Sequence, residues 1–200
     1  KLKKLQSLFY NHSRILHVSA IFFTAILFRF FYVSEISQSP LYDAPVVDGR
    51  TYTFLSNQLA SGNWLGEGLG PFWQPPLYPY VIAALRIISE TFFFDSIRWI
   101  QSVLSSLTCV GIYLLGRRWY NTRVGLLASG IACLYGPIIF FDGEVLPASL
   151  AMSISMAGLL AFEKGQNNNR KIYFFSSGVL FGFASITVAT LLCGVFTLSL

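Results

Sequence analysis

Long apolar runs without charged residues alternate along the chain with short polar segments. Each run is close to the ~20 residues that an α-helix needs to cross the hydrocarbon core of a bilayer. The pattern predicts five membrane spans, at about 15–33, 99–116, 124–141, 146–162 and 172–192. We therefore expect an all-α, polytopic transmembrane protein, with residues 1–200 forming the N-terminal part of one membrane domain.

The composition excludes an ordinary soluble domain. Hydrophobic residues make up 54% of the chain, charged residues make up 12%, and the mean hydropathy is +0.58. Soluble chains have about 45–50% apolar and about 25% charged residues. The net charge is +5, but the basic residues are not interleaved with polar and aromatic residues as in a nucleic-acid interface. Membrane lipids, and not nucleic acids, are the expected surroundings.

One apolar segment, residues 77–94, decides the topology because it also carries Arg86 and Glu90. Such charges are costly within a span. If the segment does not cross the membrane, three segments share one face and hold ten of the 14 basic residues; they are 1–14, 117–123 and 163–171. Cytoplasmic loops are enriched in Lys and Arg, so this arrangement predicts a cytoplasmic N-terminus.

This topology leaves a long outer loop at about 34–98 and a short outer turn at Asp142 and Glu144. Within the long loop we expect two juxtamembrane helices. Residues 48–62 form one, with Asp48 as its N-cap and Gly62 at its end. Residues 77–94 form the other, starting after the Pro75-Pro76 pair and placing Arg86 and Glu90 one turn apart.

The start of the first of these helices also has the residues for transfer chemistry. A carboxylate such as Asp48 can accept the proton of a hydroxyl group. The guanidinium of Arg50 can bind a phosphate as a planar fork. Capping of the helix by Asp48 is the structural alternative, and both roles are compatible. Asp48 could also share a divalent cation with Asp142 or Glu144, because such ions prefer oxygen ligands.

Five motifs resemble those of GT-C glycosyltransferases, in the same order. Three come from the first outer loop: Asp48-x-x-x-Tyr52, residues 59–64 and residues 74–79. The others are residues 98–103 leading into 113–118, and the acidic turn at 141–146. The chain is most similar to the branch of dolichyl-phosphate-mannose protein mannosyltransferases and of the bacterial transferases that add aminoarabinose or galacturonic acid to lipid A.

The resemblance implies transfer of a sugar from a polyprenyl-phosphate donor to a lipid, glycan or protein acceptor. The reaction would take place on the periplasmic or lumenal face, in a bacterial inner membrane. The implied catalytic acids are Asp48, as general base or acceptor-positioning group, and Glu144, with Asp142 as the alternative second acid. The implied substrate-binding residues are Arg50, Tyr52, Gln74, Tyr78 and Asp142.

The resemblance leaves the donor phosphate and the metal requirement open. Relatives carry a Lys before the Pro-Pro pair, where this chain has Gln74. Arg50, Arg86 or a residue beyond Leu200 would then bind the phosphate. No cofactor is expected apart from a divalent cation, on which relatives differ.

A transporter or flippase without glycosyl transfer is the alternative function. Transporters place ionisable residues or broken helices near the middle of the membrane. Here the predicted spans carry few ionisable residues at mid-depth, and the acids lie in the loops. This distribution favours chemistry at the membrane surface.

Overall fold

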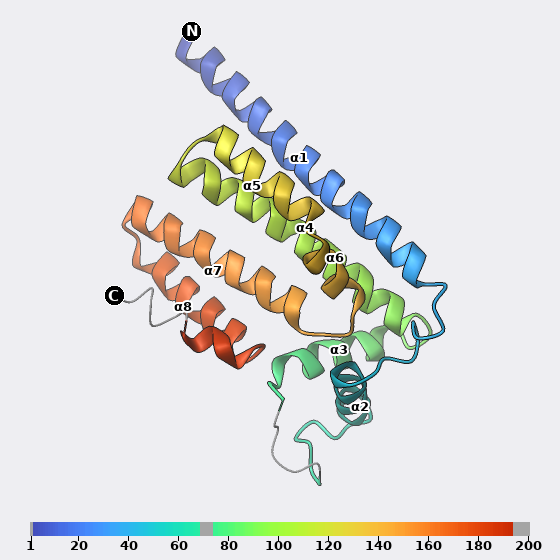
Figure 1. The fold of residues 1–200 in the computed structure, drawn as a ribbon. Helices are drawn as coiled ribbons and strands as arrows, with labels where there is room; N and C mark the ends of the chain where they lie inside the picture. Colours follow the sequence, from blue (N-terminus) through green and yellow to red (C-terminus); the bar gives the residue numbers. More distant parts are fainter. Residues whose placement is uncertain (1, 69–73, 194–200) are drawn as a thin grey trace.

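The computed structural model describes residues 2–68 and 74–193, and over these ranges the protein is helical without strands (Figure 1). This confirms the predicted all-α class. The helices are α1 (Leu2–Ile36), α2 (Asp48–Ala60), α3 (Leu77–Ile88), α4 (Phe93–Trp119), α5 (Thr122–Leu134), α6 (Gly136–Gly143), α7 (Ala148–Asn168) and α8 (Lys171–Ser185), followed by a short 3-10 turn η1 (Ala189–Leu191).

Helix α4 lies at the centre of the bundle, where it packs against α1, α5 and α7, and α7 forms an antiparallel pair with α8. The two ends of the bundle differ in charge. The α4–α5 and α7–α8 connections, with the basic segments 117–123 and 163–171, lie at one end, which we call the basic end (Figure 1). The acidic turn after α6 lies at the opposite end with α2 and α3, and we call this the acidic end.

Glycines allow neighbouring helices to approach closely. A Cβ on Gly116 of α4 would lie 2.9 Å from the Cα of Gly125 in α5. In the α7–α8 pair, the ring of Phe181 packs directly on Gly158. Small residues at helix contacts are typical of membrane proteins, where packing replaces the hydrophobic effect as the attraction between helices.

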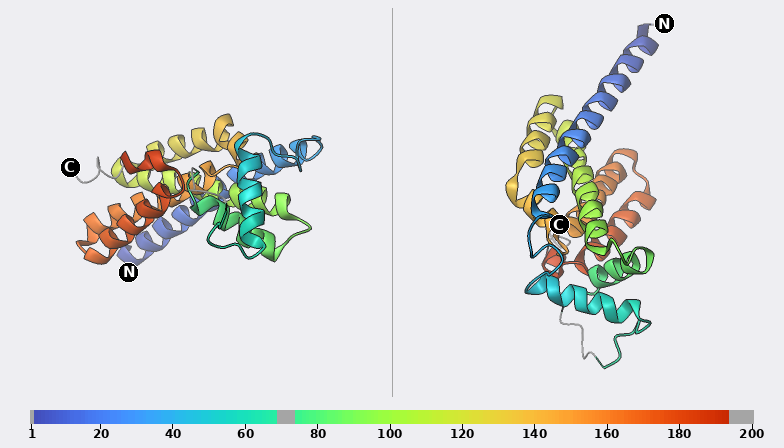
Figure 2. Two further views of the ribbon diagram at one scale, coloured as in Figure 1. Left: turned by 90° about the horizontal axis from the view of Figure 1, so that it is seen from below. Right: turned by 90° about the vertical axis from the view of Figure 1, so that its right-hand side faces the viewer.

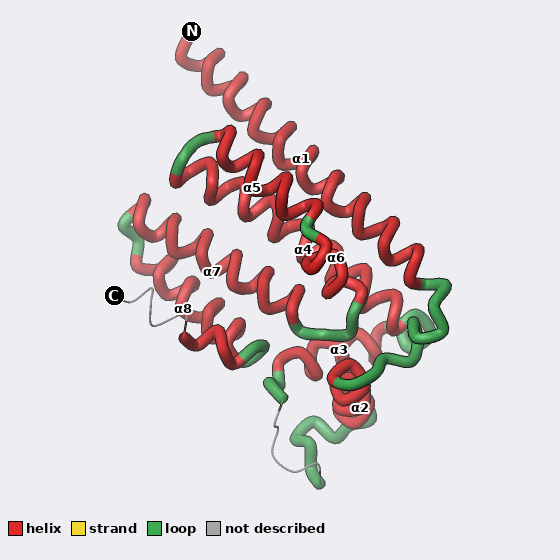
Figure 3. Tube along the Cα trace, viewed as in Figure 1, coloured by secondary structure: helices red, strands yellow, loops and turns green. Residues whose placement is uncertain are grey.

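The predicted span 124–141 is not one straight helix. It is divided into α5 and α6, which meet at an angle of 49° (Figure 3). The break falls at Tyr135, directly before Gly136 and Pro137. Pro137 has no N–H and its ring clashes with the preceding turn of a helix, so α5 cannot continue through it.

Two helical segments are long and apolar enough to cross a bilayer, Ser13–Ile36 and Phe93–Trp119. The bent α5–α6 pair makes a third if it is counted as one span. The remaining predicted spans, 146–162 and 172–192, overlap α7 and α8, but α8 ends at Ser185, before the predicted end of the last span. Neither helix is among those long and apolar enough to cross a bilayer. Large apolar side chains on α1 and α5 are exposed, including Phe23, Phe31 and Ile131, as expected for surfaces that face lipid tails.

Helices α2 and α3 lie across the acidic end of the bundle instead of running along its axis (Figure 2). Helix α3 has 12 residues and is therefore about 18 Å long, much shorter than the ~30 Å hydrocarbon core. As predicted, it begins after Pro76. It ends at Ile88, so Glu90 lies outside it and the predicted Arg86–Glu90 arrangement is wrong. The guanidinium of Arg86 instead stacks 3.5 Å above the ring of Phe93.

Helix α2 ends as the sequence predicts but begins differently. Gly62, with a φ of 102°, follows its last residues in a conformation that favours glycine. The expectation that Asp48 is the N-cap is wrong, because Val47 occupies that position and no side chain caps the helix. Asp48 is the first helical residue, where a negative charge interacts favourably with the helix dipole. Its carboxylate is therefore not used for capping.

Candidate functional site

The start of α2 and the turn after α6 are in direct contact. A Cβ placed on Gly49 would lie 3.5 Å from the carbonyl oxygen of Val145 and 3.8 Å from its Cβ. Asp48 directly precedes Gly49, and Glu144 directly precedes Val145. The structure therefore brings together the two outer segments that the sequence analysis assigned to one site.

The two carboxylates are both available for chemistry. Asp48 is exposed and Glu144 is half-buried. The ion pairs among the described residues use two other acids, Asp142 and Glu163. Neither Asp48 nor Glu144 has a side-chain hydrogen bond within the described part of the chain, so both retain their full capacity to accept protons or hydrogen bonds.

A series of side-chain contacts, made of hydrogen bonds and one ring–ring contact, links α2 to the acidic turn. The hydroxyl of Tyr52 donates to Oε1 of Gln74 at 2.8 Å, and the Tyr52 and Tyr78 rings meet edge to face. The hydroxyl of Tyr78 donates to Oε1 of Gln101 at 2.7 Å. The Nε2 atom of Gln101 then donates to the carbonyl oxygens of Asp142 and Glu144, at 3.0 and 2.7 Å.

Tyr52 and Tyr78, the two tyrosines in this series of contacts, stay neutral. Burial raises the pKa of Tyr52, and the negative charge of Asp48 raises it further. Burial raises the pKa of Tyr78 well above its usual value. Because both phenols keep their protons, they remain hydrogen-bond donors to Gln74 and Gln101.

Arg98 provides a second support for the acidic turn. Its Nε atom donates to the carbonyl oxygen of Gly143 at 2.7 Å, and Nη2 donates to the carbonyl oxygen of Tyr42 at 2.6 Å. The guanidinium also lies 3.7 Å from the centroid of the Tyr42 ring. Arg98 thus joins the first outer loop to the turn that carries Glu144.

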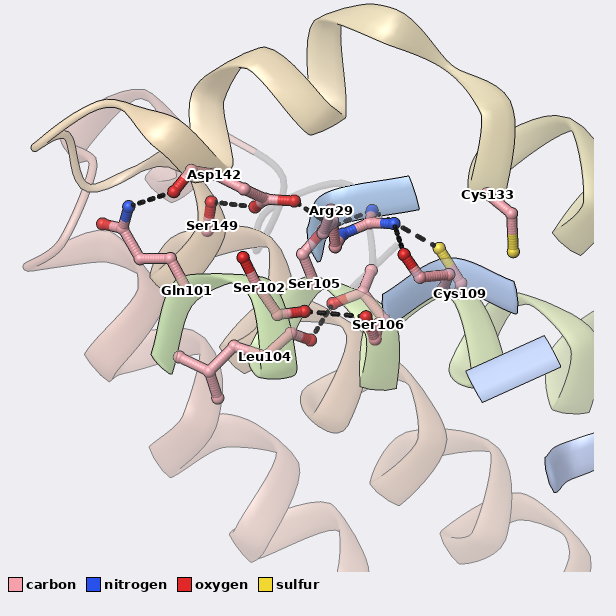
Figure 4. Close-up of polar contacts among 12 residues, drawn as sticks. Arg29, Gln101, Ser102, Leu104, Ser105, Ser106, Cys109, Cys133, Asp142 and Ser149 are labelled. Atoms are coloured by element: carbon pink, nitrogen blue, oxygen red, sulfur yellow. Dashed lines mark hydrogen bonds and ion pairs between the residues drawn. The ribbon is translucent and has the colours of Figure 1, made fainter. Parts of the chain in front are cut away.

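A buried ion pair lies beneath the turn (Figure 4). Nε of Arg29 is 2.7 Å from Oδ2 of Asp142, and both side chains are 0% exposed. Arg29 also donates to the Ser105 hydroxyl at 2.8 Å and to the carbonyl oxygen of Ala25 at 2.9 Å. The Ser149 hydroxyl donates to the second carboxylate oxygen of Asp142 at 2.5 Å.

These contacts give Asp142 a structural role, and its implied role in substrate binding or as the second acid stays a prediction. Each of its carboxylate oxygens has a protein partner, and the side chain has no exposed surface. A buried charge needs such partners because removing it from water is costly. In this structure Asp142 supports the turn from within, while Glu144 faces a cavity.

The other predicted substrate-binding residues divide into two groups. Tyr52 and Tyr78 are buried and Gln74 is half-buried. All three belong to the series of side-chain contacts that links α2 to the acidic turn. Arg50 is exposed in the first turn of α2 and does not belong to it. Arg50 follows Asp48 by two positions in the sequence, and its side chain is exposed at the surface.

Sequence reasoning missed Arg29, Arg98 and Gln101. The role of Arg29 could have been predicted, because an ionisable residue within a membrane span usually marks a functional site and has a polar partner. Arg29 lies within the predicted span 15–33 and is one of the few ionisable residues there. Arg98 and Gln101 lie three residues apart at the start of an apolar run, so they share one helix face. Both residues belong to the motif at 98–103, but the motif alone does not indicate what they bind.

The metal hypothesis has limited support in the geometry. Among residues 2–68 and 74–193, no group of three His, Cys, Asp or Glu side chains could hold a metal ion. A divalent cation at Asp48 and Glu144 would thus take most of its oxygen ligands from water or substrate, as Mg²⁺ commonly does. Sharing of a cation by these two acids stays a prediction.

Comparison with known proteins identifies one family. The family model described as dolichyl-phosphate-mannose-protein mannosyltransferase matches residues 73–199, which is more than half of the chain. The matched part includes the second acidic turn, Arg98 and Gln101, but not Asp48. No curated protein and no solved structure matches the chain. The family match favours the glycosyltransferase over the transporter alternative.

Proposed function

Because this chain belongs to the dolichyl-phosphate-mannose-protein mannosyltransferase family, and is thus a membrane glycosyltransferase-like protein, we propose the following reaction. It moves a sugar from a polyprenyl-phosphate donor to a hydroxyl of a lipid, glycan or protein acceptor. The reaction takes place at the acidic end. The membrane is a bacterial inner membrane, so this end faces the periplasm and the N-terminus is cytoplasmic.

The contact between Gly49 and Val145 carries this proposal. Asp48 and Glu144, whose carboxylates have no partner among the described residues, thus lie on adjoining segments, although 96 positions separate them in the chain. Transfer between two substrates requires the catalytic groups to be held in fixed positions relative to the reacting atoms. The polar contacts of Gln101 and Arg98 provide the rigid support for one of the two segments.

In the proposed step, the acceptor oxygen attacks the anomeric carbon of the donor sugar. A bond forms between these two atoms, and the bond from the anomeric carbon to the phosphate oxygen breaks. The electron pair leaves with polyprenyl phosphate, and the proton of the acceptor hydroxyl passes to Asp48. Because phosphate is already a good leaving group, positioning and charge stabilisation contribute most. Arg50, at the surface beside Asp48, is our candidate ligand for the donor phosphate.

The test is sugar transfer by the full-length protein in vesicles, from labelled polyprenyl-phosphate sugars. Loss of a positioned base typically lowers the rate by about 10²–10⁴-fold, and we expect this for Asp48→Asn. Protein abundance should not change and thermal stability should fall only slightly, because Asp48 makes no capping hydrogen bond and the substitution removes only its favourable interaction with the helix dipole. Glu144→Gln should give a smaller defect.

Asp43→Asn is the matched control. Asp43 is an exposed acid of the same loop, five residues before Asp48, and we expect near-normal turnover from this variant. Near-normal turnover of Asp48→Asn at equal abundance would contradict the assignment of the base. Absence of transfer by the unmodified protein from all polyprenyl-phosphate sugars tried would contradict the reaction itself.

A further inference from the structure

A cavity of about 260 Å³ lies beside the acidic turn. It is enclosed by the end of α1, the loop after it, the end of α6 and the start of α4. Its apolar walls include the rings of Tyr32, Tyr42 and Phe140, and its charged lining residues are Arg98 and Glu144. Pockets for drug-sized ligands usually measure about 300–1,000 Å³, so this cavity suits a smaller group.

One nitrogen of Arg98, a residue that lines this cavity, has no hydrogen-bond partner among the described residues. The side chain is 4% exposed, and Nε and Nη2 are bound to backbone carbonyl oxygens. The third nitrogen, Nη1, is buried and has no partner among the described residues. A buried donor without an acceptor is costly, and a bound ligand could supply that acceptor.

Glu144 has the complementary capacity. Its backbone carbonyl is engaged by Gln101, whereas its carboxylate has no bond to another described side chain. The residues that line the cavity therefore include one donor and one acceptor without partners among the described residues, together with aromatic side chains. A ligand that fits must both accept and donate hydrogen bonds and must have an apolar face.

We propose that this cavity binds the monosaccharide of the polyprenyl-phosphate donor. Sugar hydroxyls both donate and accept hydrogen bonds, and the C–H faces of a sugar ring pack on aromatic side chains. The cavity also lies next to the proposed base, since its wall includes Val46, two residues before Asp48. This inference rests on the proposed function, because it names the binding site of the transferred group.

The geometry favours a sugar over the donor phosphate as the occupant. Arginine binds phosphate best through two parallel N–H groups. In Arg98 two of the three nitrogens are already bound to Gly143 and Tyr42, so a single nitrogen is left. The carboxylate of Glu144 in the same cavity would also repel a phosphate.

The test compares the affinity of the full-length protein in vesicles for two kinds of lipid. One is polyprenyl phosphate, and the other is polyprenyl phosphate carrying mannose, galacturonic acid or aminoarabinose. We expect at least a tenfold preference for one sugar-bearing lipid. Ala44→Trp, which fills the cavity from its wall, should reduce that preference at least tenfold and leave the affinity for polyprenyl phosphate within twofold. Gln38→Trp, in the same loop but outside the cavity, is the control and should match the unmodified protein.

Three outcomes would overturn the inference. They are no preference for any sugar-bearing lipid, an unchanged preference in Ala44→Trp, and an equal loss of affinity for both kinds of lipid, which would indicate a phosphate site. The smaller Ala44→Leu substitution, with an intermediate effect expected, guards against misfolding of the first variant. Because binding is measured without turnover, failure of this test is distinct from absence of transfer, which concerns the proposed function.

Discussion

Arg29 in α1 and Asp142 in α6 are 113 residues apart in the chain, and their charged groups lie 2.7 Å from each other with no exposed surface. The pair joins the first candidate span to the segment that ends in the acidic turn. Ser105 of α4 binds the same guanidinium, and Ser149 of α7 binds the same carboxylate. Four helices thus meet at one polar cluster below Glu144.

Removing one member of this pair should destabilise the protein strongly. Breaking a buried ion pair by deleting one partner costs about 3–5 kcal/mol, because the other charge stays buried. We expect Arg29→Gln to lower the thermal unfolding temperature of the detergent-solubilised protein. The double variant with Asp142→Asn should recover part of the loss, because no unpaired charge remains.

The pair formed by Arg118 and Glu163 at the basic end is the comparison. Arg118 is 37% exposed, whereas Glu163 is 5% exposed. Without Arg118, the Glu163 carboxylate still accepts a hydrogen bond from Nδ2 of Asn167, and pairs with an exposed partner contribute less than fully buried ones. Arg118→Gln should therefore have a much smaller effect on the unfolding temperature. Additive losses in the Arg29 and Asp142 single and double variants would contradict the coupling that we infer.

Gln101 should tolerate no exchange of its amide for a carboxylate. Its Nε2 donates to two backbone carbonyl oxygens, of Asp142 and Glu144. In Gln101→Glu an acceptor would face these two acceptors, and unsatisfied buried groups cost about 1–3 kcal/mol each. We expect a lower unfolding temperature and at least a tenfold loss of transfer activity.

Gln74→Glu is the matched control for this effect. Gln74 uses only its oxygen, which accepts from Tyr52, in the described contacts. A carboxylate can accept the same bond, so the unfolding temperature should stay close to that of the unmodified protein. Equal destabilisation by the two substitutions would show that the donor bonds of Gln101 do not hold the turn.

The sequence predicted the helical class and the two helices of the outer loop because both depend on local signals. Apolar runs of span length indicate membrane helices, and Pro76 and Gly62 mark the start of one outer helix and the end of the other. The start of α2 at Asp48, with Val47 as N-cap, was not predictable in this way. The φ of Val47 is 51°, a conformation that β-branched residues rarely adopt.

The candidate site was predicted only in part, since its supports are contacts between distant segments. Asp48 and Glu144 were recognisable as acids that follow membrane spans. The roles of Arg29, Arg98 and Gln101 depend on which carbonyl or carboxylate each of them meets, and partners 41–113 positions away are not visible in a single sequence. The bend at Pro137 was a local signal that the apolar run concealed.

The distribution of basic and acidic segments predicts which positions are accessible from outside. In a background without the native cysteines 109, 133 and 193, single cysteines at Ser61 and Glu90 should react with an impermeant thiol reagent. A cysteine at Asn168, at the basic end, should not react until the membrane is permeabilised. The side chains of Ser61, Glu90 and Asn168 are all exposed in the structure. A difference in labelling between these positions therefore reports the membrane face. Labelling of Ser61→Cys and Glu90→Cys from opposite faces would show that α3 crosses the membrane.

Tyr42 should make the acidic end sensitive to alkaline pH. Burial, together with the hydrogen bond that its hydroxyl donates to Asp95 at 2.6 Å, raises the pKa of Tyr42 from 10.0 to about 12. The folded protein therefore holds this proton more tightly than the unfolded chain. The resulting stabilisation is complete below pH 10 and is lost as the pH rises through about 12.

Tyr42→Phe tests this expectation, because it removes both the hydroxyl and its titration. The variant should unfold at a lower temperature than the unmodified protein at pH 8, owing to the lost bond to Asp95. The difference between the two unfolding temperatures should shrink between pH 10 and pH 12, since only the unmodified protein loses this contribution. Tyr120→Phe, at an exposed position of the basic end, controls for general alkaline effects and should show no such convergence. A temperature difference that stays constant up to pH 12 would mean that the Tyr42 proton does not contribute to the stability of the acidic end.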